Sequence, residues 1–367
     1  MEEYDRPAFF LVMKYAEGVD RDVIDMVSGN PDWEPPAALR EGIREYADAD
    51  VSAYQYPPST GLRELREAIA DRHGVDVDSV VVTNGTGEAN HLATACGYEV
   101  FDGEEILLTD PVYPYYYGRA SMLGATARFV AAAEDGQLDP AAVREAASSE
   151  TSVIVVNSPN NPTGAVYGAE TKRELVAIAE EYDALLVSDE VYEQFDYGGS
   201  FASALSVDSP NRAVTNGFSK SMAVTGLRMG YGIYPESVID EVRTQHMLIN
   251  VACSRPAQHA VLKALRETPE AYYEATRAVL GERIETFCSA LDDIGATYTR
   301  PQGGFYIMVR FDGFPGTLDN VKRLIEEAGV AGMPGDAFGD SREEWIRFAL
   351  VTPRVEEAAD RLAAFFD

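Results

Sequence analysis

The sequence predicts an α/β protein whose large domain is a mainly parallel sheet covered by helices, joined to a smaller α+β domain. In the middle of the chain, short apolar and β-branched runs alternate with stretches whose apolar residues recur at helical spacing. Crossovers between parallel strands produce this pattern, because each one places a helix on a face of the sheet. After residue 269 the alternation ends, and a long helical stretch precedes mixed strands and helices.

The strands expected in the large sheet are short. They are residues 80–83, 105–109, 152–157, 184–188, 213–216 and 229–233, and a helix is expected at 169–182. Polar or turn-forming residues follow each strand, such as Asn-Gly-Thr-Gly at 84–87 and Asp-Glu at 189–190. Because ligands of open α/β sheets bind beyond the carboxyl ends of the strands, these residues predict an active site there.

The smaller domain is expected to follow a long helical segment. Its further elements are strands at 297–299, 305–310 and 345–350, a helix at 319–328 and a terminal helix. We therefore predict three segments. Residues 1–45 pack with the small domain, residues 46–268 form the large domain, and residues 269–367 form the small domain. A chain of 367 residues is of the length expected for two domains.

The chain is strongly acidic, with 61 Asp and Glu residues against 30 Lys and Arg residues and a formal net charge of -31. Nucleic acid is not an expected partner, because surfaces that bind it are basic. Only five of the cations are lysines. Such a composition resembles that of proteins from organisms that accumulate molar salt, where a Debye length of about 3 Å screens self-repulsion. We expect a halophilic protein; the alternative is an ordinary acidic cytosolic one.

Neither a membrane span nor a metal site is expected. No run approaches the roughly 18 apolar residues that a spanning helix needs. The first residues do not read as a signal peptide, which predicts a cytoplasmic protein. The three cysteines are far apart and the four histidines form no ligand spacing, so we expect neither a disulfide framework nor a bound metal.

The segment most specific for function is residues 219–230, Ser-Lys-Ser-Met-Ala-Val-Thr-Gly-Leu-Arg-Met-Gly. Lys220 follows an expected strand and has small and apolar neighbours. A lysine that attacks a carbonyl group near neutral pH needs a pKa lowered by burial or by neighbouring charges. Most lysines are surface groups, and this one is of interest because the chain has so few.

This segment resembles the cofactor-lysine signature of class I/II aminotransferases, the aspartate aminotransferase-like enzymes of pyridoxal-phosphate (PLP) fold type I. Five further segments resemble elements of the family in the family's order. They are residues 56–66, 157–164, 188–193, 301–306 and 346–349. One such motif arises easily by chance, whereas six in order do not. The resemblance runs from about residue 28 to the end and implies fold type I with pyridoxal 5'-phosphate as cofactor.

The resemblance implies three catalytic residues, Lys220, Asp189 and Tyr192. Lys220 would hold PLP as a Schiff base and then move a proton at the substrate Cα. Asp189 would keep the pyridine nitrogen protonated, since a carboxylate within about 4 Å favours the charged form; the alternative is a helix cap. Tyr192 and Asn161 would hydrogen-bond the cofactor's phenolic oxygen, although Asn161 also suits a turn.

Further contacts with PLP follow from the same resemblance. They are Gly85, Thr86, Gly87, Tyr113, Ser219 and Arg228. Residues 85–87 open an expected helix, whose amide groups suit the phosphate, although Gly-x-Gly alone would indicate only a turn. Arg228 would add a charged contact to the phosphate, and Tyr113 would stack on the ring. The family often has a serine where this chain has Gly217, and Ser219 is the expected replacement.

The substrate contacts implied by the family are Arg347, Asn161 and Gly29. Arg347 would bind the α-carboxylate through two parallel hydrogen bonds; the alternative is a surface arginine in a strand. Gly29 lies in a segment that resembles the one closing over the substrate. Tyr56 resembles a residue that reaches the phosphate of the neighbouring subunit, which implies a homodimer with shared active sites.

The predicted function is transfer of an amino group from an L-amino acid to a 2-oxo acid. A PLP-dependent lyase or decarboxylase of the same fold is the first alternative. A non-enzymatic PLP-binding regulator is the second, which the acidic charge and the short N-terminal extension disfavour. The sequence leaves the amino acid open. Lys14 and Arg119 are candidates for a second cation facing a dicarboxylate, with surface positions as the alternative.

Overall fold

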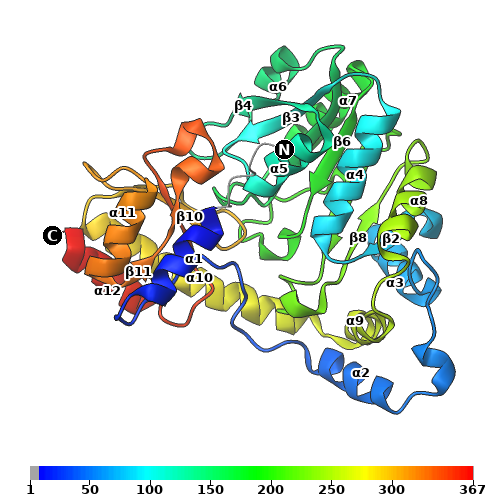
Figure 1. Cartoon of the computed structure of the whole chain (residues 1–367), viewed down its shortest axis with the longest axis horizontal. Coiled ribbons are helices and arrows are strands. Elements are labelled where there is room, and N and C mark those ends of the chain that lie inside the picture. Colours follow the sequence, from blue (N-terminus) through cyan, green and yellow to red (C-terminus); the bar gives the residue numbers. More distant parts are fainter. Residues whose placement is uncertain (1–7, 367) are drawn as a thin grey trace.

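A seven-stranded sheet forms the centre of the larger lobe in the structure, a computed structural model that describes residues 8–366 (Figure 1). The strand order is β2-β8-β7-β6-β5-β3-β4. The strands are β2 (Val80–Thr83), β3 (Glu105–Asp110), β4 (Thr126–Ala131), β5 (Thr151–Asn157), β6 (Leu185–Asp189), β7 (Arg212–Gly217) and β8 (Gly230–Ile233). β8 is antiparallel to both neighbours and the other pairs are parallel, so the predicted mainly parallel sheet is confirmed.

The sequence prediction misses one strand of this sheet, β4. The six other strands of this sheet lie within a residue or two of their predicted positions, because they are buried on both faces and read as continuous apolar runs. β4 forms one edge of the sheet, pairs with β3 alone and has a largely exposed surface. An edge strand of this kind lacks the apolar run on which the prediction depends.

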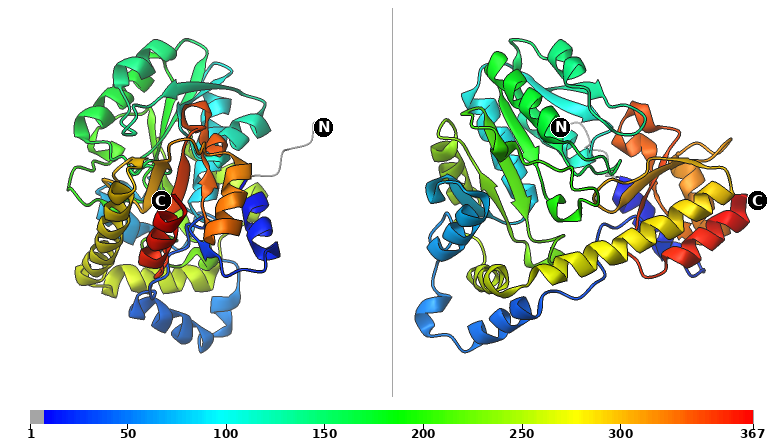
Figure 2. Two further views of the ribbon diagram at one scale, coloured as in Figure 1. Left: turned by 90° about the vertical axis from the view of Figure 1, so that its left-hand side faces the viewer. Right: turned by 180° about the vertical axis from the view of Figure 1, so that it is seen from behind.

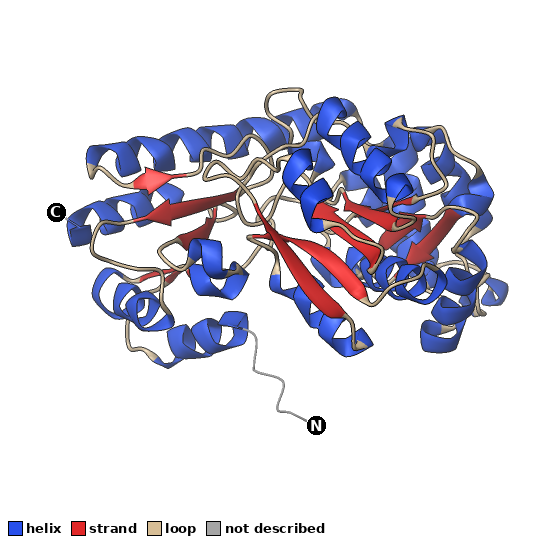
Figure 3. Ribbon diagram, turned by 90° about the horizontal axis from the view of Figure 1, so that it is seen from above, coloured by secondary structure: helices blue, strands red, loops and turns tan. Residues whose placement is uncertain are grey.

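Helices cover both faces of this sheet, which Figure 3 shows as strands enclosed between helices. They are α3 (Arg63–His73), α4 (Thr86–Val100), α5 (Pro114–Leu123), α6 (Pro140–Ala146), α7 (Ala169–Glu181), α8 (Ile239–Asn250) and α9 (Arg255–Glu267). One apolar layer joins α4 and α8 to the sheet, and another joins α6 and α7 to its opposite face. α4 packs against β5 to β8 and is therefore buried over most of its length.

The smaller lobe contains a four-stranded sheet of order β12-β13-β10-β9 and the parallel pair β1–β11. Its strands are β1 (Ile24–Asp25), β9 (Thr297–Tyr298), β10 (Tyr306–Arg310), β11 (Val330–Ala331), β12 (Met333–Pro334) and β13 (Ile346–Ala349). Its helices are α1 (Ala8–Gly18), α10 (Glu270–Asp293), α11 (Leu318–Arg323) and α12 (Val355–Phe366). α10 is a long helix that runs from beneath the larger lobe into the smaller one, where it packs against α12 (Figure 2).

Short helical turns connect these elements. They are the 3₁₀ turns η1 (Val51–Tyr54), η2 (Val77–Ser79), η3 (Glu193–Phe195), η4 (Ala204–Ser206), η5 (Thr225–Leu227), η7 (Gly335–Phe338) and η8 (Asp340–Arg342), and the π-helical turn η6 (Leu324–Ala328). In residues 8–366, no helix has the length and apolar character needed to cross a membrane.

The N-terminal segment divides between the two lobes. α1 packs on α11 and β12, and β1 pairs with β11, as expected for a segment that joins the small domain. α2 (Ala37–Ala47) instead packs on α9, in the larger lobe. This contact is close because Gly42 faces it: a Cβ at Gly42 would lie 2.9 Å from the Cα of Ala260. The prediction that residues 1–45 pack with the small domain is therefore wrong for α2, and residues 1–7 lie outside the described residues.

Candidate active site

A cavity of about 390 Å³ opens at the carboxyl ends of β5, β6 and β7, where the smaller lobe meets the sheet. From the larger lobe it is lined by the ends of these strands and the start of α4, and from the smaller lobe by β10 and β13. Its position agrees with the general place of ligands in open α/β sheets. A wider hollow of about 620 Å³ lies on the smaller lobe near Arg21 and Phe365, and none of its described lining residues was predicted as a site residue.

Lys220 lies in the cavity, directly after the turn that ends β7. Its Nζ donates a hydrogen bond to the carbonyl oxygen of Gly29 at 2.6 Å. Burial lowers the pKa of this amine; the nearby Tyr306 opposes the effect, and the cations Arg347 and Arg228 add to it. The amine therefore loses its proton at a lower pH than an ordinary lysine, as a nucleophile must.

Asp189 ends β6 and presents its carboxylate to the same cavity. Oδ2 accepts hydrogen bonds from Asn90 Nδ2 at 2.6 Å and from the Tyr116 hydroxyl, and Oδ1 accepts one from the amide of Val191 at 3.0 Å. Burial raises the pKa of Asp189, while these three donors act in the opposite direction. A buried carboxylate that faces a cavity suits a cationic N–H group.

Arg347 reaches the cavity from β13, where it is 3% exposed. Its Nη1 donates to Asn161 Oδ1 at 3.1 Å, and its Nη2 donates to the carbonyl oxygen of Val27. The guanidinium carbon lies 4.5 Å from the centre of the Tyr306 ring, and Nε has no hydrogen-bond partner in the part of the chain that the structure describes. A fixed, buried guanidinium with donor capacity left over suits a carboxylate ligand.

Two tyrosines line the cavity beside these groups. The hydroxyl oxygens of Tyr192 and Tyr306 lie 3.3 Å apart, and burial raises the pKa of Tyr192 well above its usual value. The phenol of Tyr192 therefore stays protonated and can donate a hydrogen bond. The ring of Tyr113, at the start of α5, is half-buried at the cavity wall.

The start of α4 forms the other end of the cavity. Gly85 precedes the helix with a φ of 78°, and a Cβ there would lie 2.6 Å from Arg228 Nη2. Arg228 is itself fixed by hydrogen bonds from Nη1 to the carbonyl oxygen of Thr225 and from Nη2 to that of Asn84. The buried Thr86 hydroxyl has no hydrogen-bond partner among residues 8–366. Helix amide groups, a hydroxyl and a guanidinium thus converge as a phosphate site requires.

The position of Thr86 leaves no room for a side chain at Gly217. A Cβ at this position would lie 2.4 Å from Thr86 Oγ1. The hydroxyl of Thr86 therefore occupies the space that a serine at residue 217 would need. Ser219, the expected replacement, also lines the cavity, so the chain has two hydroxyl groups near the position of the missing one.

The sequence profile of the family "Aminotransferase class I and II" matches residues 21–362. The chain belongs to this aminotransferase family. It is 33% identical to an aspartate aminotransferase of Thermotoga maritima, covering 100% of this chain and 96% of the relative. It is 31% identical to aromatic-amino-acid aminotransferase 2 of Thermococcus litoralis, covering 95% and 92%. A solved structure of Thermus thermophilus aspartate aminotransferase with maleate superposes with a TM-score of 0.91 at 30% identity, covering 98% and 97%.

These findings establish the general activity. The protein is a PLP-dependent aminotransferase of fold type I, with an amino acid and a 2-oxo acid as substrates. The relatives that align over nearly their full length bear aminotransferase names, which favours transamination over the lyase, decarboxylase and regulator alternatives.

The cavity of this aminotransferase fits PLP on its own geometry. The Thr86 hydroxyl, which has no hydrogen-bond partner among the described residues, and the guanidinium of Arg228 suit the phosphate group. Asp189 suits the ring nitrogen, and the amine of Lys220 suits the carbonyl carbon. In the described part of the chain, no group of three or more His, Cys, Asp and Glu side chains is arranged to hold a metal ion.

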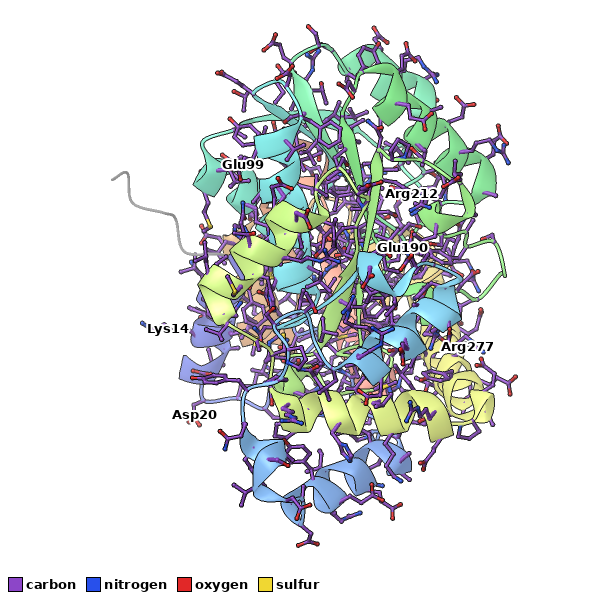
Figure 4. All side chains as sticks on the ribbon, turned by 90° about the vertical axis from the view of Figure 1, so that its right-hand side faces the viewer. Lys14, Asp20, Glu99, Glu190, Arg212 and Arg277 are labelled. Atoms are coloured by element: carbon purple, nitrogen blue, oxygen red, sulfur yellow. The ribbon has the colours of Figure 1, made fainter. Side chains whose placement is uncertain are left out.

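Most of the predicted site residues of the aminotransferase meet in this cavity. They are Gly29, Thr86, Gly87, Tyr113, Asn161, Asp189, Tyr192, Ser219, Lys220, Arg228 and Arg347. Gly85 lies behind them against Arg228. Tyr56 is not among the described residues that line the cavity, and it is 85% exposed. Of the two candidate second cations, Arg119 lines the cavity, whereas Lys14 points outward from α1 (Figure 4).

Sequence reasoning missed three residues of the aminotransferase site. Tyr306 belongs to the segment 301–306, which resembles a family motif, but the sequence predicts no contact for it. In the structure its ring packs on Arg347. Asn90 and Tyr116 both hydrogen-bond Asp189. Tyr116 belongs to an aromatic run that also contains Tyr113, and Asn90 carries no motif signal at all.

Proposed function

We propose that this aminotransferase works through Lys220, Asp189 and Arg347. The observation that carries the proposal is that a buried amine, a buried carboxylate and a buried guanidinium face one cavity. Together these three groups supply what PLP and an amino acid require.

Each residue then has a distinct task. Bound PLP supplies a ring that accepts electrons from the substrate Cα when its proton is removed. Lys220 Nζ would hold the cofactor and would move a proton at the substrate Cα. Asp189 holds a proton on the ring nitrogen. Arg347 orients the α-carboxylate, and Asn161 and Tyr192 donate to the phenolic oxygen, with Tyr306 beside them.

The side-chain preference is the next part of the proposal. The relatives are named for aspartate, prephenate and aromatic amino acids. The cavity combines the aromatic side chains Phe9, Tyr113 and Tyr115 with Arg119, so it offers both apolar faces and a cation to the substrate side chain. Aspartate and the aromatic amino acids are therefore the donors to test first.

The test follows the absorbance of the bound cofactor in purified protein supplied with PLP. Aspartate or an aromatic amino acid should convert the band to that of the aminated cofactor, and a 2-oxo acid should reverse the change. Lys220→Ala should lose the lysine-linked band, while Lys172→Met serves as a second lysine replacement outside the cavity. Conversion by wild type and by Lys220→Ala at equal rates would contradict the assignment of Lys220.

We further propose a homodimer in which Tyr56 acts on the partner's site. Tyr56 is 85% exposed, and Met247, Leu248, Ile249 and Val251 add a run of exposed apolar side chains. A test mixes subunits that carry Lys220→Ala with subunits that carry Tyr56→Ala. In the hybrid dimer, one site has both an intact Lys220 and an intact Tyr56 from the other subunit, so activity above that of either parent is expected. Activity no greater than that of the parents would contradict sharing.

Location, salt adaptation and domain boundaries complete the proposal. We also propose a cytoplasmic and halophilic enzyme, and the net charge of -31 supports the salt adaptation. For the domains, the packing of α2 on α9 supports a boundary before residue 37, so that residues 8–36 and 269–366 belong to the small domain. Residues 37–268 then form the large domain.

A further inference from the structure

Asn90 hydrogen-bonds the carboxylate of Asp189, and both ends of its amide group have a side-chain partner. It lies in the second turn of α4, is 3% exposed, and reaches the cavity wall between α4 and the sheet. Its Nδ2 donates to Asp189 Oδ2 at 2.6 Å, and its Oδ1 accepts from Thr215 Oγ1 at 2.6 Å. Asp189 and Thr215 are register partners on the adjacent strands β6 and β7. One side chain on α4 thus links the two strands beneath the cofactor site.

The amide of Asn90 has one orientation that satisfies both neighbours. An ionised carboxylate only accepts hydrogen bonds, so Asp189 requires the NH₂ group of Asn90. The oxygen of Asn90 then faces Thr215, whose hydroxyl can donate to it. Rotating the amide by half a turn would place two acceptors together beside Asp189. The carboxylate of Asp189 therefore selects this orientation, and the hydroxyl of Thr215 holds it by donating to Asn90 Oδ1.

Several charged or titratable groups surround Asp189 from other elements. Arg119 on α5 favours its ionised form, and Tyr116 on α5 donates to the same oxygen as Asn90. Lys172 on α7, Lys220 after β7 and Tyr192 after β6 are also close enough to interact with its charge. Burial acts against ionisation, so the neutral donors contribute to keeping the carboxylate charged.

We propose that Asn90, oriented by Thr215, is a positioning residue that keeps Asp189 ionised and directed at the ring nitrogen of the cofactor. This inference rests on the role of Asp189 in the proposed function. If the carboxylate of Asp189 is less ionised or points elsewhere, the ring nitrogen of the cofactor loses its proton more easily. The ring then loses a positive charge, which raises the pKa of the protonated nitrogen that joins Lys220 to the cofactor.

The test is a pH titration of the visible absorbance of the bound cofactor in the whole enzyme. Asn90→Leu removes the donor at similar volume and should raise the absorbance pKa by about one unit. Thr215→Val keeps the shape of Thr215 but removes its hydrogen bond to the Asn90 amide. It should also raise the absorbance pKa, by less than Asn90→Leu does. Thr215→Ser keeps the hydroxyl and should restore the wild-type value. Thr94→Val, one turn further along α4, is the matched control, because the Thr94 hydroxyl bonds only the backbone oxygen of Asn90 among the described residues.

Asp189→Asn separates failure of this inference from failure of the proposed function. If Asp189→Asn shifts the absorbance pKa while Asn90→Leu and Thr215→Val leave it unchanged, the role of Asp189 stands and the inference is overturned. If Asp189→Asn also leaves it unchanged, the proposed role of Asp189 is wrong and the inference falls with it. Should Asn90→Leu fail to fold, the contrast between Thr215→Val and Thr215→Ser decides, since a purely structural role for Asn90 predicts equal titrations.

Discussion

Lys172 and Lys220 show how position and hydrogen-bond partner decide the use of a lysine amine. Lys172 is completely buried, but it lies 3.3 Å from the carboxylate of Glu190 and donates to Ser188 (Figure 4 labels Glu190 in the interior). Lys220 donates to a neutral carbonyl oxygen instead. Burial lowers the pKa of both amines, and at Lys172 the carboxylate of Glu190 opposes this effect. Position and partner together single out Lys220 as the reactive amine.

His73 predicts a local dependence of stability on pH. Burial, together with the charge of Arg72, lowers its pKa to about 4, and its Nε2 lies 2.8 Å from the Tyr231 hydroxyl. The unfolded state, with a histidine pKa of about 6.5, therefore binds the proton more strongly. The contribution of neutral His73 is complete above pH 6.5 and is lost as the pH falls towards 4.

Replacing His73 by Gln should remove this dependence. Between pH 7 and pH 4.5, the free energy of unfolding of wild type should fall by about 2 kcal/mol more than that of the variant. Denaturant unfolding at the two pH values measures the difference, and all other titrating groups cancel in the comparison. Equal losses in the two proteins would show that His73 takes up its proton without a cost in the folded state.

The residues that could be predicted from sequence are those whose chemical type the cofactor dictates. Lys220, Asp189 and Arg347 stand in segments that resemble motifs of the family, so roles for them could be expected before any contact was known. Asn90 was not predictable, because its role depends on α4 packing over β6 and β7. The position of Tyr306 beside Arg347 likewise depends on the pairing of β10 with β13.

At the scale of elements, the phosphate end of the cavity depends on how closely β8 approaches the start of α4. A Cβ at Gly230 would lie 2.5 Å from both the carbonyl carbon of Gly85 and the amide nitrogen of Thr86. These are backbone atoms, so they cannot move aside as a flexible side chain could. The helix amides reach the cavity because the first residue of β8 has no side chain.

Gly230→Ala should therefore push the start of α4 away from the phosphate. We expect a loss of about 1–3 kcal/mol in stability and at least about a tenfold weaker affinity for PLP, from overpacking and displaced amides. Equilibrium dialysis against PLP measures the affinity. Gly226→Ala is the control in the same segment, because nothing lies within 4 Å of a Cβ there. Equal affinities of the two variants would contradict the steric argument.

Over the whole molecule, charge is the dominant surface property. Most ion pairs are exposed, such as Arg63–Glu67 and Arg323–Glu327, and exposed pairs contribute little each. They leave the net charge of -31 unchanged, so mutual repulsion of carboxylates destabilises the folded state at low ionic strength. The stability of this protein should thus depend strongly on screening.

Raising KCl from 0.2 M to 3 M should raise the thermal unfolding midpoint, because the Debye length falls below about 3 Å. The rise should be steep at low salt and smaller above about 1 M, where repulsion is already screened. Thermal unfolding in a KCl series measures it, with an equal series of glycerol to separate solvent exclusion from screening. An unfolding midpoint independent of KCl would contradict a halophilic protein.

The distribution of the site along the chain also fixes the order in which a ribosome can supply it. Thr86, Asp189, Lys220 and Arg228 are all made by the time β8 ends at residue 233. Arg347 is made last, and it then bonds Asn161 and the carbonyl oxygen of Val27, near the opposite end of the chain. The cofactor-binding residues Thr86, Asp189, Lys220 and Arg228 are therefore synthesised more than a hundred residues before Arg347, which binds the substrate carboxylate in the proposed function. Synthesis itself separates acquisition of the cofactor from the onset of turnover.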